Sequence, residues 1–95
     1  MNELIQTLHP DPSKQGVRIE KDKYDTMRET ILLNLKQLGA VTFTELSTVV
    51  EHQLSGRFDG SVMWYFTTVK LDLEARGELR RVPKSKPQLV ELAAR

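Results

Sequence analysis

The fold is decided by residues 61–82, which read SVMWYFTTVKLDLEARGELRRV. Ser61 is a favourable helix N-cap, and Gly77 is a typical helix stop. Between them, four apolar residues recur at helical spacing and predict a face that packs inward: Val62, Phe66, Val69 and Leu73. Beyond Gly77, residues 79–82 predict a strand. This segment is therefore a predicted helix, ending at Arg76, that leads directly into a strand.

Two more helices are predicted before this segment. Apolar residues spaced by three and four predict a helix over residues 22–38, ended by Gly39, with an inward stripe of Tyr24, Met27, Ile31, Leu35 and Leu38. The short apolar pair Ala40-Val41 follows it. The next helix begins at the capping box formed by residues 42–45 and closes at Gly56. Its inward stripe is Phe43, Leu46, Val49, Val50 and Leu54.

A β-hairpin is predicted at the C-terminal end. The strand at residues 79–82 is followed by a tight connection, Pro83-Lys84-Ser85-Lys86-Pro87, and by a returning strand at residues 88–92. The predicted order is thus helix, short strand, helix, helix and hairpin. It indicates an α+β fold of the winged-helix type over residues 21–95, in which the hairpin is the wing.

Residues 1–20 are predicted to be a leader that packs on this domain. Leu4, Ile5 and Leu8 suit one apolar helical turn, which the sequence His9-Pro10-Asp11-Pro12 stops. The alternation at residues 17–20 predicts a short strand whose apolar residues turn toward the domain.

Composition limits the protein to one small folded domain. The chain has 95 residues, of which 39% are hydrophobic and 28% charged, and it has no cysteine for a disulfide or a thiolate metal site. The longest uncharged stretch, residues 60–69, is far shorter than the roughly 18 apolar residues that a membrane span needs. No secretory signal is evident, so a cytoplasmic location without membrane association is expected.

Two resemblances support the fold. The run Leu73-Glu74-Ala75-Arg76-Gly77 resembles the end of the recognition helix in many bacterial regulators. The whole chain resembles a small group of bacterial winged-helix-like proteins of unknown function through His9-Pro10-Asp11-Pro12, Gly16-Val17-Arg18-Ile19, Trp64-Tyr65 and the segment 71–77. This resemblance implies the winged-helix fold and no particular activity.

Binding to double-stranded DNA in a regulatory role is the first functional hypothesis. In a winged helix, the helix at residues 61–76 would enter the major groove and the wing would contact phosphates. The net charge of +1 is unevenly placed, because residues 76–86 sum to +4. The predicted contacts are Arg57, Ser61, Thr67, Thr68, Lys70, Arg80, Arg81, Lys84 and Lys86. Lys70 is the only cation of the helix before Arg76, and Asp72 and Glu74 offset it.

A protein interface is the alternative hypothesis. The outward side of the same helix carries a second stripe, Trp64, Thr68, Leu71 and Ala75, and large exposed apolar surfaces mark interaction sites. Trp64 and Leu71 would then be the centre of a contact with a second copy or another protein. The leader itself is a further possible cover for this stripe, and it would also block the face that reads DNA.

Catalysis is not expected. The two histidines, His9 and His52, have no spacing partner for a metal, and no nucleophile, base and orienting group come together in a motif. The sequence therefore predicts no catalytic residue, no metal and no cofactor.

Overall fold

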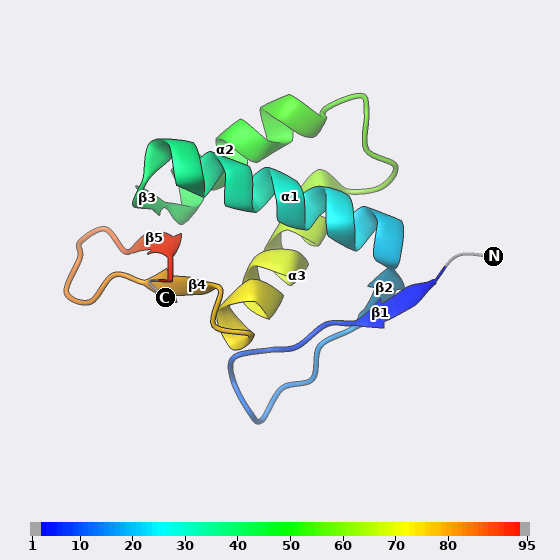
Figure 1. Ribbon diagram of the computed structural model, residues 1–95, viewed down its shortest axis with the longest axis horizontal. Helices are drawn as coiled ribbons and strands as arrows, with labels where there is room; N and C mark the ends of the chain where they lie inside the picture. The colour runs from blue at the N-terminus through cyan, green and yellow to red at the C-terminus, as the bar shows by residue number, and fades with distance from the viewer. Residues whose placement is uncertain (1–2, 94–95) are drawn as a thin grey trace.

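The computed structural model describes residues 3–93, and Figure 1 shows its elements. Its three helices are α1 (Lys21–Leu38), α2 (Phe43–Leu54) and α3 (Val62–Ala75). Its five strands are β1 (Leu4–Gln6), β2 (Arg18–Glu20), β3 (Val41–Thr42), β4 (Leu79–Arg81) and β5 (Leu89–Leu92). The helices pack on one another, with the hairpin of β4 and β5 at one end and that of β1 and β2 at the other (Figure 1).

The strands form two small antiparallel sheets. β1 pairs with β2, so that Ile5 lies opposite Ile19. In the second sheet β5 is central, and it pairs with β3 on one side and β4 on the other. The strand that follows α1 is thereby tied to the last strand of the chain. This arrangement confirms the predicted α+β class, and it is compatible with a winged helix.

The core lies where the three helices meet. Its fully buried side chains come from all of them and from β5: Met27, Ile31, Leu35, Leu46, Val50, Phe66, Val69, Leu73 and Val90. The prediction that Leu38 points inward is wrong, because this side chain is 51% exposed in the last turn of α1. Phe43 is also more exposed than predicted, although its ring packs edge-on against Phe66 at 5.2 Å between centroids.

Local hydrogen bonds define the helix ends as predicted. Thr42 and Glu45 form a full capping box at the start of α2, and the Ser61 hydroxyl accepts a hydrogen bond from the backbone N–H of Trp64. At the end of α3, the backbone N–H of Gly77 donates to the carbonyl of Glu74, and that of Glu78 donates to Leu73. Gly77 has a φ of 78°, which the turn into β4 requires and which side chains disfavour.

The leader is a β-hairpin, so the predicted helical turn at Leu4, Ile5 and Leu8 is wrong. Strand pairing with β2 gives this segment a period of two, which turns Ile5 inward and leaves its neighbours exposed. Thr7, just after β1, is buried: its backbone N–H and its hydroxyl both donate to the carbonyl of Val17. A side chain at Gly16 would stand 2.0 Å from the Thr7 carbonyl oxygen, so only glycine fits there.

Replacing Gly16 with alanine is expected to lower the free energy of unfolding by about 1 to 3 kcal/mol, because the new methyl group overlaps backbone atoms that cannot move aside alone. Chemical denaturation would measure the loss. Ser13→Ala, in the same loop but exposed, is the control and should be nearly neutral. Equal stability of the two variants would show that the leader is not packed as described.

Candidate nucleic-acid interface

The outer face of α3 is only partly covered by the rest of the chain. Trp64 is 47% exposed, whereas Thr68, Leu71 and Ala75 are half-buried. These four side chains lie on one side of the helix because they are separated by three and four residues. The N-terminal half of α3 thus presents an indole ring to the surface.

That indole belongs to an aromatic cluster. Trp64 packs edge-on against Tyr65 with 4.9 Å between ring centroids, and Tyr65 packs in the same way against Phe58 at 5.1 Å. The ammonium group of Lys23, from α1, lies 5.3 Å from the Tyr65 centroid. These contacts support the Trp64 side chain on one side while the rest of the ring remains exposed.

A three-residue charge cluster lies on the flank of α3. The carboxylate of Glu74 contacts the Lys70 ammonium through one oxygen, and its other oxygen accepts a hydrogen bond from Arg81 Nε at 3.2 Å. Lys70 is only 6% exposed, and its ammonium lies 5.5 Å from the Phe43 ring centroid. Lys70 and Arg81, both predicted phosphate contacts, are therefore directed at a carboxylate of the chain itself.

The remaining wing cations differ in their partners. Arg80 Nε is 3.0 Å from Glu91 Oε2 across the β4–β5 pair. Lys84 and Lys86, at the tip, are exposed and make no ion pair within residues 3–93. The tip itself is ordered by Ser85, whose hydroxyl donates to the Val82 carbonyl at 2.9 Å and accepts from the Leu89 backbone N–H. The two lysines are thus displayed on a turn of defined shape.

The other predicted contacts lie nearer the start of α3. Arg57 is exposed in the loop after α2, where its backbone N–H donates to the Leu54 carbonyl. Ser61 is exposed but already serves as the helix cap. Thr67 and Thr68 are half-buried, and Thr68 belongs to the outward stripe of α3. Arg57 and the wing tip therefore contribute cations from separate loops.

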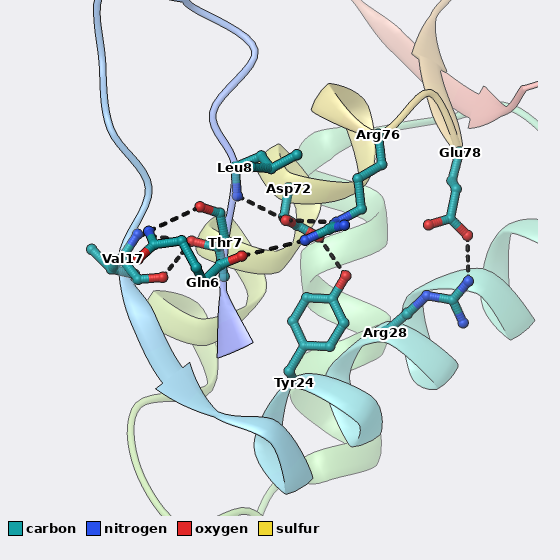
Figure 2. Close-up of polar contacts among 9 residues, drawn as sticks. All are labelled: Gln6, Thr7, Leu8, Val17, Tyr24, Arg28, Asp72, Arg76 and Glu78. Carbon is teal, nitrogen blue, oxygen red and sulfur yellow. Dashed lines mark hydrogen bonds and ion pairs between the residues drawn. The ribbon is translucent and has the colours of Figure 1, made fainter. Parts of the chain in front are cut away.

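A buried carboxylate, Asp72, anchors the opposite flank of α3 (Figure 2). It accepts hydrogen bonds from the backbone N–H of Leu8 at 2.8 Å, from the Tyr24 hydroxyl and from Arg76 Nε. Burial, together with the hydrogen bond to Asp72, raises the pKa of Tyr24 to about 12. The same carboxylate raises the pKa of Arg76. Asp72 therefore joins the leader, α1 and α3.

The leader approaches α3 near its C-terminal end. Its residues 6–9 and 14–16 line one shallow hollow together with Ala75. Leu4, Leu8 and Val17 of the leader are 40% to 56% exposed, so they do not bury themselves against the outer stripe of α3, and Trp64 stays 47% exposed. The leader thus contacts the C-terminal part of α3 and leaves the Trp64 indole, in the first turn of the helix, accessible.

Residues 3–93 contain neither a metal cluster nor a membrane-spanning helix. Within that range no three His, Asp or Glu side chains come together as a metal site. In the same range no helix has the length and apolar character needed to cross a membrane.

Sequence reasoning missed the partners of the charged residues on α3. Lys70 and Glu74, like Asp72 and Arg76, are four residues apart, and that spacing on a helix predicts an ion pair. This signal could have identified both pairs. Nothing in the sequence, however, indicated that Arg81 would reach Glu74 or that Leu8 would reach Asp72.

The fold and this surface define a small α+β protein with a three-helix core. The chain belongs to a family of unknown function (DUF6958), whose pattern matches residues 4–90. No curated protein and no solved structure matches the chain.

Asp72→Asn is expected to lower the free energy of unfolding by about 1 to 3 kcal/mol, since a buried acceptor shared by three donors loses its charge. The pKa of Tyr24 should fall from about 12 toward its ordinary value of 10.0. Phenolate absorbance during a pH titration measures this shift, and denaturation measures stability. Asp59→Asn, at an exposed carboxylate, is the control and should change neither quantity.

The wild-type protein should also lose stability as the pH rises from 10 to 12. Tyr24 binds its proton more tightly in the folded chain than in the unfolded chain, so the folded state holds more protons in this interval. The stabilisation that the protonated Tyr24 hydroxyl contributes is fully present below pH 10 and disappears above about pH 12. A smaller decline in Asp72→Asn than in wild type would assign the effect to this hydrogen bond, whereas parallel curves would contradict it.

Proposed function

We propose that the chain is a winged-helix domain that binds double-stranded DNA in a regulatory role. The observation that supports this most directly is the wing: β5 joins β3 to β4, and the tip of the hairpin displays Lys84 and Lys86 without ion pairs among the described residues. In such a fold a helix enters the major groove while the wing contacts the backbone.

In this proposal, the contacts to DNA come from the edges of the surface. Lys84, Lys86 and Arg57 contact phosphates, and Thr67 and Thr68 approach base edges from α3. Arg80 can exchange Glu91 for a phosphate, because an exposed ion pair contributes only about 0 to 1 kcal/mol. Lys70 and Arg81 instead pair with Glu74, so the proposal does not include them among the residues that contact DNA.

The proposal predicts salt-dependent binding that relies on the wing tip. Wild-type protein should bind a random-sequence duplex at low salt and lose affinity as salt rises, because bound cations release counterions. Lys84→Ala combined with Lys86→Ala should weaken binding and reduce the slope of log affinity against log salt by about 1.8, or roughly 0.9 per lost phosphate contact. Fluorescence anisotropy with labelled duplex measures both.

Arg18→Ala combined with Lys21→Ala is the matched control, since it removes two positive charges from β2 and the start of α1. Its slope should stay close to that of wild type. An equal fall in both double variants would mean that only net charge matters, and no binding of wild type even at low salt would reject the proposal.

A protein partner on the outer face of α3 is the second candidate function. It is favoured by the 47% exposure of Trp64 and by the pairing of Lys70 and Arg81 with Glu74, which reduces the positive charge of the surface that DNA would have to approach. If the duplex experiment gives no binding, Trp64 and Leu71 become the residues to test, and Trp64→Ser should then abolish the partner contact without unfolding the chain.

A further inference from the structure

An apolar groove of about 550 Å³ lies between α1 and the C-terminal end of the second sheet. Its apolar wall is formed by Leu32 and Leu33 from α1, by Leu92 at the end of β5 and by the following Ala93. Leu33 is 54% exposed and Leu92 is 37% exposed. α1 and β5 lie next to each other, and the groove runs along their outer side.

This groove is not explained by the packing of the chain. Leu33 lies on the side of α1 opposite the core residues Met27, Ile31 and Leu35, so it adds nothing to the interior. Single exposed leucines are common, but here two of them share a hollow with further apolar side chains. Apolar groups gathered in this way favour a partner that removes them from water.

The charges beside the groove indicate which partner fits. Two of the four charged residues that line it, Arg28 and Glu78, pair with each other. The other two, Glu29 and Lys36, lie beside Leu32 and Leu33 and make no ion pair within residues 3–93. Along α1, Glu29 precedes Leu32 by three residues and Lys36 follows Leu33 by three. The two charged residues are therefore equally far from the midpoint between Leu32 and Leu33, and their charges are opposite. A surface of this kind is complementary to itself when two copies of the helix run in opposite directions.

We infer that two copies of this chain associate through this groove, with their α1 helices antiparallel about a two-fold axis between Leu32 and Leu33. Leu33 of each copy then enters the groove of the other, beside Leu92. Glu29 of each copy faces Lys36 of the other at both ends of the contact. A parallel pairing would instead place like charges opposite one another, which is unfavourable. Such a contact is isologous, as expected for a two-fold dimer.

This interface is separate from the proposed DNA surface. The groove lies on the outer side of α1, whereas Trp64 lies on the outer side of α3, and the core lies between the two helices. The dimer neither requires DNA nor blocks the wing tip. Its test is made without nucleic acid, so the two proposals can fail independently.

The first experiment compares two leucines of the same helix. Leu33→Glu should convert the dimer to a folded monomer, raising the dissociation constant at least about tenfold, because it places a charge at the centre of the contact. Leu38→Glu is the matched control: Leu38 is 51% exposed but does not line the groove, so the variant should keep the dimer mass. Sedimentation equilibrium gives the masses, and circular dichroism checks folding.

Leu33→Ala provides a second test of the same contact if the Leu33→Glu variant fails to fold. It removes the side chain from the contact without adding a charge, and it should raise the dissociation constant in the same direction. A dimer mass that neither folded Leu33 variant changes would overturn the inference.

The second experiment tests the antiparallel arrangement. Glu29→Lys alone should weaken the dimer, since it puts two cations together at each end. Adding Lys36→Glu to the same chain should restore the dimer, because opposite charges face each other again. Failure of the double variant to recover would contradict this geometry.

Two further results would reject the interface. One is a wild-type mass equal to that of a single chain at every concentration that stays in solution. The other is dissociation by Trp64→Glu with no effect of Leu33→Glu, which would place the contact on α3 instead.

Discussion

Asp72 lies fully buried on α3, where it accepts hydrogen bonds from the leader backbone, from Tyr24 on α1 and from Arg76. A carboxylate inside a protein costs several kcal/mol unless such donors surround it. The three donors therefore have to be held in place together, and this requirement fixes the leader against the two helices. Because the leader is attached at the C-terminal end of α3, the N-terminal half with Trp64 stays open to a partner.

Glu74 controls the charge of the opposite flank. By contacting Lys70 and Arg81, it reduces the positive charge that α3 and the base of the wing would otherwise present. Among the cations without ion pairs in the described chain, Lys84 and Lys86 lie at the wing tip and Arg57 lies in the loop before α3. A nucleic acid would accordingly be held at the edges of this surface, around a centre that contains an aromatic ring.

Much of the fold could be predicted because its signals are local. The ends of α1, α2 and α3 fall within a residue or two of the predicted ones, since caps and apolar periodicity involve neighbours in sequence. The prediction for the leader was wrong because three apolar residues suit a helical turn as well as a strand. Only the pairing of this segment with Arg18–Glu20 decides between the two. For the candidate site, the sequence indicated which residues could contact DNA. It did not indicate which of their cations would be paired with a carboxylate of the chain itself.

The sequence by itself determined the three helices, their caps and the C-terminal hairpin, because each depends on residues a few positions apart. Tertiary structure alone decided that Leu8 meets Asp72, 64 residues away, that Arg81 turns to Glu74, and that Leu33 and Leu92 share one groove. Such contacts follow from how helices and strands pack in three dimensions. The sequence pattern of one segment does not predict which distant charge or apolar surface will lie beside that segment in the folded chain.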